Sequence, residues 1–122
     1  MIAFREAVEA GDLDGMFATL ARDVTFHSPV VFTPFEGKET VAKVLEAAFQ
    51  TFEDFRYTDE LGGGGVHGLV FRARVGDKEV EGIDLLRLDD DGKIADFTVM
   101  VRPASALMAL GEAMAPRVAG LK

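Results

Sequence analysis

The main change in the spacing of apolar residues along this chain lies near residue 52, and it restricts the folds available to the chain. Before that point apolar residues recur at helical spacing, as in Val41, Val44, Leu45 and Phe49. Afterwards apolar and polar residues alternate, which is the period of a half-buried strand. Helices that precede a series of antiparallel strands can cover one face of the sheet. The sequence therefore predicts an α+β fold in which helices pack against one curved antiparallel sheet.

Glycine, proline and capping residues set the expected element boundaries. Gly11 ends a first helix and Asp12 is a good N-cap for a second. The predicted helices cover residues 4–10, 13–21, 39–49 and 104–114. The predicted strands cover residues 24–28, 52–57, 66–75, 80–88 and 94–102, with a glycine turn at 62–65. No repeat or linker interrupts the chain, so residues 1–122 are expected to form one domain.

Composition limits the classes of function. The chain has 122 residues, of which 48% are hydrophobic and ten are phenylalanine, enough for one core. Its net charge of −8 disfavours binding to nucleic acid or to anionic membranes. The chain has no cysteine, and its two histidines show no ligand-like spacing, so we expect no metal and no cofactor. No leader and no apolar run of membrane-spanning length is visible, so a cytoplasmic location is expected.

Two segments resemble a known family. Residues 10–15 (AGDLDG) and 20–26 (LARDVTF) are similar to the opening of SnoaL-like and ketosteroid-isomerase-like proteins, in the nuclear transport factor 2-like superfamily. Residues 82–88 (GIDLLRL), followed by 89–94 (DDDGKI), resemble their late hairpin. The resemblance implies a cone-shaped curved antiparallel sheet packed against helices, an apolar pocket and a homodimer. It leaves the activity open, because this fold hosts isomerases, cyclases, hydrolases and non-catalytic binding domains.

Residues carried over from the resemblance point to one carboxyl group. Ketosteroid isomerases use a general-base aspartate, an oxyanion-hole tyrosine and a protonated oxyanion-hole aspartate. The last of these matches Asp84, whereas the base position falls on Ser28 and the tyrosine position on Phe4. Because the base and one oxyanion donor are missing, steroid isomerisation by that mechanism is not expected.

Asp84 is also notable without the resemblance, because Ile83, Leu85 and Leu86 surround it in an apolar strand. A carboxyl group on an apolar inner face needs a partner or keeps its proton, since burial raises its pKa. Such a group suits a general acid or a hydrogen-bond donor to a developing oxyanion. The alternative is a structural aspartate that is paired or faces solvent.

Four other polar residues are weaker candidates. His27 and Ser28 end the first strand, where an imidazole has a suitable pKa for a general base. Adjacent strand residues face opposite sides, so His27 faces away if Ser28 faces the pocket, and packing is its alternative role. Tyr57, the single tyrosine, is either a replacement oxyanion donor or a packing residue. If strand alternation holds, His67 faces inward with Leu69 and Phe71. It also follows four glycines, after which the alternation is easily shifted.

These observations lead to one functional hypothesis and one alternative. The hypothesis is a cofactor-independent isomerase, cyclase or hydrolase of a small hydrophobic carbonyl or polyketide-like compound, with Asp84 assisted by Ser28 or His27. The alternative is a non-catalytic binding module for a small hydrophobic ligand, or an interaction subunit. The residues predicted to line the pocket are Phe4, Phe17, Phe26, Phe32, Leu45, Tyr57, Phe71, Leu86, Phe97 and Val99. Arginines of the strands are expected on the outer face, beside Glu79 and Glu81.

Overall fold

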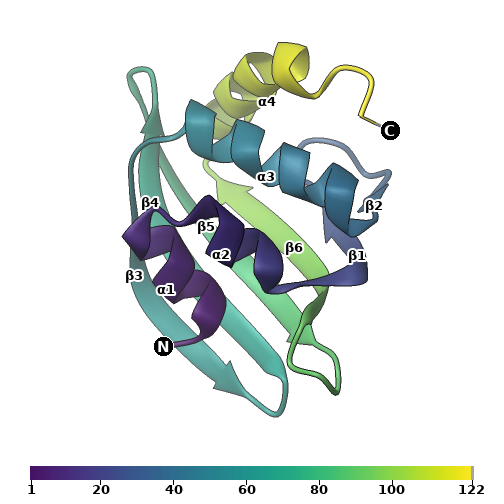
Figure 1. Ribbon diagram of the computed structural model, residues 1–122. Helices are drawn as coiled ribbons and strands as arrows, with labels where there is room; N and C mark the ends of the chain where they lie inside the picture. Colours follow the sequence, from purple (N-terminus) through teal and green to yellow (C-terminus); the bar gives the residue numbers. More distant parts are fainter. Residues whose placement is uncertain (122) are drawn as a thin grey trace.

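The order of helices and strands in the computed structural model, which describes residues 1–121, follows the change in apolar spacing (Figure 1). The helices are α1 (Ala3–Ala10), α2 (Leu13–Ala18), α3 (Lys38–Thr51) and α4 (Ala104–Val118). The strands are β1 (Leu20–His27), β2 (Phe35–Glu36), β3 (Glu53–Gly63), β4 (Val66–Val75), β5 (Lys78–Leu88) and β6 (Ile94–Arg102).

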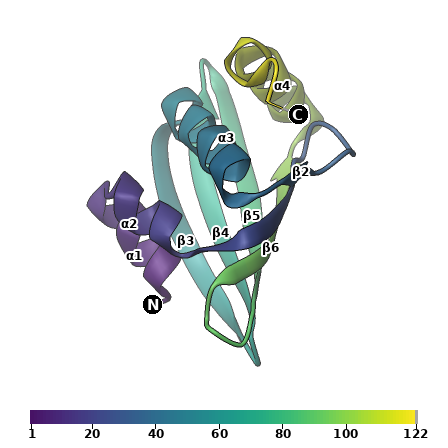
Figure 2. The ribbon, with the colours of Figure 1, turned by 45° about the vertical axis from the view of Figure 1, so that its right-hand side comes forward.

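All six strands belong to one sheet in the order β2-β1-β6-β5-β4-β3. The strands from β3 to β6 pair with their neighbours antiparallel, and β2 pairs antiparallel with β1. The single exception to the predicted antiparallel sheet is β1, which runs parallel to β6. The sheet is curved and unclosed, and the helices cover one of its faces, with α1 and α2 over one part and α3 and α4 over another (Figure 2). The predicted α+β fold is therefore confirmed.

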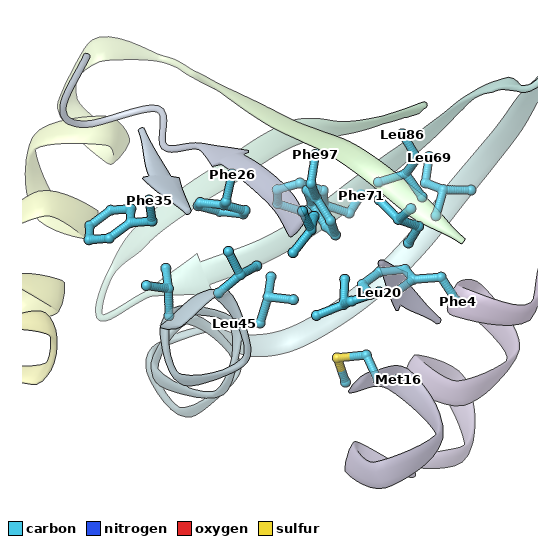
Figure 3. Packing of buried hydrophobic residues seen from close by; sticks show 14 of the residues in the cluster. Phe4, Met16, Leu20, Phe26, Phe35, Leu45, Leu69, Phe71, Leu86 and Phe97 are labelled. Atoms are coloured by element: carbon cyan, nitrogen blue, oxygen red, sulfur yellow. The ribbon is translucent and has the colours of Figure 1, made fainter. Parts of the chain in front are cut away.

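The core lies between the inner face of the sheet and the helices, where phenylalanine rings meet apolar helix residues (Figure 3). On β4, Leu69, Phe71 and Ala73 are at most 1% exposed, as the predicted alternation requires. The ring of Phe97 on β6 lies 5.2 Å from those of Phe4 and Phe26. Complete burial of one such side chain contributes about 1.5–3 kcal/mol, so these rings fix α1 and β1 against the sheet.

Local features explain where the helices begin and end. Asp12 caps α2 as predicted, because its Oδ1 accepts a hydrogen bond of 2.9 Å from the Gly15 amide. The prediction that this helix continues to residue 21 was wrong. Leu20 and Ala21 are instead buried in β1, where Leu20 pairs with Ile94 of β6. A local helical pattern was overridden by strand pairing with a distant part of the chain.

The short strand β2 was not predicted, and two further ends differ from the prediction by four residues or more. The strand predicted to end at Tyr57 continues to Gly63, because its pairing with β4 extends to a turn formed by Gly64 and Gly65. Both turn glycines have positive φ, 62° and 84°, which suits residues without a Cβ. The last helix extends four residues beyond Met114 and includes Pro116.

The outer face of the sheet carries the expected arginines. Glu81 of β5 forms ion pairs with Arg72 at 3.2 Å and with Arg102 at 2.9 Å. Arg74 lies opposite Glu79 in the β4–β5 register, as expected, and its guanidinium forms an ion pair with Asp54 at 2.8 Å. No helix within residues 1–121 is long and apolar enough to cross a membrane.

Candidate functional site

A cavity of about 280 Å³ lies between the inner face of the sheet and helices α3 and α4. Its wall is almost entirely apolar and includes seven phenylalanines. The lining residues are Phe26, Ser28, Pro29, Val30, Val31, Phe35, Val44, Leu45, Ala48, Phe49, Phe52, Phe55, Phe71, Asp84, Phe97, Val99, Leu110, Gly111, Met114, Ala115 and Val118. Only two of these side chains, Ser28 and Asp84, carry a polar group.

The mouth of the cavity lies between the segment after β1 and the end of α4. Val30, Val31 and Ala115 are the lining residues that are exposed. Gly111 of α4 allows Val30 to approach closely, since a Cβ added there would lie 3.1 Å from Val30 Cγ1. These contacts hold the two sides of the mouth together.

Strand alternation and register place Asp84 on the inner face. Asp84 pairs with Val99 of β6 and with Leu69 of β4. Leu86, two residues further along β5, lies opposite Phe97 on the same face. Asp84 is only 5% exposed, and it is one of two buried polar residues in the described chain.

Tyr57 is the hydrogen-bond partner of Asp84. Its phenol donates a bond of 3.0 Å to Asp84 Oδ2. Within residues 1–121, no hydrogen bond involves the other oxygen of Asp84, Oδ1. In the same residues every fully enclosed polar side-chain atom has a hydrogen-bond partner, so Oδ1 is not fully enclosed. Because Asp84 lines the cavity, Oδ1 is the atom available to a ligand.

Burial decides the protonation of this pair. It raises the pKa of Asp84 from 3.8 to about 7, although the hydrogen bond from Tyr57 acts in the opposite direction. Burial, followed by the nearby Asp84 carboxyl, raises the pKa of the Tyr57 phenol far above its ordinary range. The phenol therefore stays a donor, whereas Asp84 changes between a donor and an acceptor near neutral pH.

The Tyr57–Asp84 hydrogen bond joins β3 to β5 across β4. It therefore depends on the packing of the residues between and beside them. The two strands flank β4, where Tyr57 pairs with Phe71 and Phe71 pairs with Gly82. A Cβ on Gly82 would lie 2.4 Å from Cζ of Phe71, so the glycine leaves room for that ring. On the other side, the Arg5 guanidinium lies 5.8 Å from the centre of the Tyr57 ring.

Ser28 and His27 lie on different sides of the strand, as alternation predicts. Ser28 lines the cavity, where its Oγ accepts a hydrogen bond of 3.0 Å from the Val30 amide. His27 does not line it and lies 3.0 Å from Asp96 Oδ2, while Thr98 donates to the other oxygen of Asp96. The His27 side chain therefore does not contact the cavity, and it cannot assist Asp84 there.

The structure separates the other predicted pocket residues into two groups. Phe26, Leu45, Phe71, Phe97 and Val99 line the cavity. The remaining five do not line it.

Phe4 and Leu86 are at most 1% exposed and belong to the core cluster, where the ring of Phe4 packs against Phe97. Phe17 is partly buried against the same core. Phe32 is fully exposed in the loop after β1, where no element covers it. Tyr57 is buried and reaches the site through Asp84.

The sequence prediction missed part of the wall. Phe35, Phe49, Phe52 and Phe55 line the cavity from β2, α3 and β3. Helical spacing placed Phe49 on the inward side of α3, which was a usable signal. The end of α4 could not be located in the same way, because its small residues have no strong pattern.

Neither histidine forms a metal site. The described part of the chain has no group of three His, Cys, Asp or Glu side chains that could hold a metal ion. His67 is half-buried on β4, paired with Gly62 and Leu86, and does not line the cavity.

Comparisons with known proteins agree with this geometry. A family model described as a SnoaL-like domain matches residues 1–97. An uncharacterised bacterial protein with a cystatin-like fold, from Silicibacter pomeroyi, is 37% identical over 97% of this chain and 84% of its own, with a TM-score of 0.91. A protein described as a steroid delta-isomerase, from Pseudomonas aeruginosa, is 44% identical over 93% of this chain and 85% of its own, with a TM-score of 0.88.

More distant structures share the fold alone. An NTF2-like protein from Mesorhizobium loti is 17% identical over 82% of this chain and 85% of its own, with a TM-score of 0.72. Among proteins with curated descriptions, none matches this chain. The chain shares its fold with NTF2-like proteins. Since the family model covers most of its length, the chain belongs to the SnoaL-like domain family.

Proposed function

We propose that this protein is a cofactor-independent enzyme that promotes enolisation of a small hydrophobic carbonyl compound in its cavity. The observation that carries the proposal is the Asp84 carboxyl, which is buried, held at 3.0 Å by Tyr57 and free at Oδ1 toward the cavity. Its pKa of about 7 makes it a donor to a carbonyl oxygen at and below neutral pH.

The chemistry requires one bond to break. A C–H bond next to the carbonyl releases its proton to a water molecule or buffer base at the mouth of the cavity, and the electron pair forms the enolate. The negative charge develops on the carbonyl oxygen, which receives the hydrogen bond or proton from Asp84 Oδ1. The apolar wall strengthens that interaction, because water does not screen it.

The similarity to a protein described as a steroid delta-isomerase supports carbonyl chemistry but not the same base. The ketosteroid-isomerase-like base position is Ser28, whose hydroxyl is not a base at neutral pH. We therefore assign Ser28 the role of a second hydrogen-bond group near the mouth, and we assign no general base to the protein.

Deuterium exchange into phenylacetone, a one-ring enolisable ketone, tests this proposal. The protein in D₂O should accelerate exchange at the carbon next to the carbonyl, and Asp84→Asn should reduce the rate about a hundredfold. Asparagine has nearly the same shape and cannot give up a proton. Asp96→Asn, on the outer face of β6, is the matched control and should leave the rate unchanged.

The alternative, a non-catalytic binding module, is favoured by one observation, the small number of polar groups in the cavity. A module needs one anchor and an apolar wall, which Asp84 and the phenylalanines provide. Saturable binding of phenylacetone without exchange above the Asp84→Asn rate would establish the module and contradict the enzyme. The homodimer and the cytoplasmic location expected from the sequence stay predictions.

A further inference from the structure

We infer that the cavity takes a neutral, flat two-ring molecule with a single carbonyl or phenolic oxygen, and that it does not take a steroid. This inference rests on the proposed site at Asp84 and specifies its ligand class. Three properties of the cavity carry it: its volume, the arrangement of its aromatic rings and its lack of cationic groups.

The volume limits the number of rings. An apolar cavity of about 150 Å³ accommodates one benzene molecule. The cavity here, at about 280 Å³, is nearly twice as large and lies just below the range of about 300–1,000 Å³ typical for drug-sized ligands. Two fused rings with one oxygen fit this space, whereas the four rings of a steroid need about twice as much.

The rings on the wall favour a flat ligand. Phe26 lies 5.2 Å from Phe97 on the β1–β6 side of the cavity. On the β3–β4 side, Phe55 stacks on Phe71 at 4.9 Å with an angle of 27° between the rings. Both groups line the same cavity, so a planar ligand contacts aromatic surface on two sides.

The charges on the wall favour a neutral ligand. No lysine, arginine or histidine lines the cavity within residues 1–121, so a buried carboxylate ligand has no counter-ion. Protonated Asp84 donates a hydrogen bond from Oδ1, which a carbonyl or phenolic oxygen accepts and an ammonium group, having no lone pair, does not. Asp84 lies deep in the cavity and Val30 at its mouth, so the oxygen of the ligand enters first.

Calorimetric titration at pH 6 tests the inference with four two-ring compounds that differ in one substituent, and with one steroid. The probes are β-tetralone, tetralin, β-aminotetralin, tetralin carboxylate and the steroid androstenedione. We expect β-tetralone to bind about tenfold more tightly than tetralin, which lacks the oxygen. The steroid and both charged analogues should bind at least tenfold more weakly than β-tetralone. Tighter binding of androstenedione or of either charged analogue overturns the inference.

Variants locate the binding. Ala48→Leu places three more carbons in the cavity and should weaken β-tetralone about tenfold, whereas Ala42→Leu on the same helix, outside the lining, should have no effect. The double variant Asp84→Leu with Tyr57→Phe removes the donor and its partner together. It should bind β-tetralone and tetralin equally, and a preserved preference for β-tetralone contradicts the role of Asp84.

The two proposals fail in different ways. If the size and charge preferences hold but phenylacetone exchange does not depend on Asp84, only the enzymatic function is wrong. If exchange depends on Asp84 but the steroid binds more tightly than β-tetralone, only the ligand class is wrong.

Discussion

Asp84 and Asp96 lie on neighbouring strands of one sheet and differ in nearly everything that determines the behaviour of a carboxyl group. Asp84 faces inward, is 5% exposed and has one neutral hydrogen-bond donor, Tyr57. The Asp96 side chain is 35% exposed on the outer face and is close to both His27 and Thr98. The two residues show that the face of the sheet on which an aspartate lies, rather than its residue type, decides whether it is suited to acid chemistry.

The largest expected effect is on stability as a function of pH. Asp84 has a pKa of about 7 in the folded protein and an ordinary value of 3.8, so the folded state binds more protons between these values. Its contribution to stability is therefore present at low pH and is lost as pH rises to about 7. This interval corresponds to about 4 kcal/mol.

Asp84→Asn removes this titration and retains the shape of the protonated group. From pH 4 to pH 8 its free energy of unfolding should increase relative to the wild type by about 4 kcal/mol, measured by urea unfolding. Asp96→Asn serves as the comparison from the outer face and should show no such gain. Parallel pH profiles for the wild type and Asp84→Asn would show that the carboxyl is not buried in the way described.

A smaller effect is expected from Tyr57→Phe. Without the phenol, the ionised Asp84 loses its only hydrogen-bond donor, so the pKa of Asp84 should be higher than in the wild type. The free energy of unfolding at pH 8 should fall by about 1.5–3 kcal/mol, and by less at pH 5, where Asp84 is protonated.

Carbon-detected NMR titration of the Asp84 carboxyl measures this pKa directly. Thr58→Val, at the next position of β3 on its exposed side, is the control and should leave the pKa of Asp84 unchanged. A lower pKa in Tyr57→Phe would mean that water or another donor replaces the phenol.

The contrast between the two aspartates was predictable in part from the sequence. Alternation alone placed Asp84 and Leu86 on one face of their strand and separated the facing of Ser28 from that of His27. These relations depend only on residues one or two positions apart. Period-two geometry fixes them before the full fold is known.

The Tyr57–Asp84 contact could not be predicted in the same way. It joins β3 to β5 across the intervening β4, so it depends on strand order, on the curvature of the sheet and on the space left by Gly82. Phe32 illustrates the same limit in a loop. Its apolar character suggested the cavity wall, but the segment after β1 leaves it fully exposed.

The smallest effects should come from the outer face, and they test the comparison most strictly. His27 and Asp96 are 3.0 Å apart with side chains 40% and 35% exposed, so solvent screens their interaction. His27→Gln and Asp96→Asn should each change the free energy of unfolding by less than about 1 kcal/mol at pH 6.

Neither variant should change deuterium exchange into phenylacetone, because neither side chain lines the cavity. His27 is adjacent to Ser28 and Asp96 is adjacent to Phe97, so a displaced backbone at either residue is a short route from this pair to the cavity. A rate loss in His27→Gln comparable to that in Asp84→Asn would therefore show that the two faces of the sheet act as one site, and the distinction between the two aspartates would no longer hold.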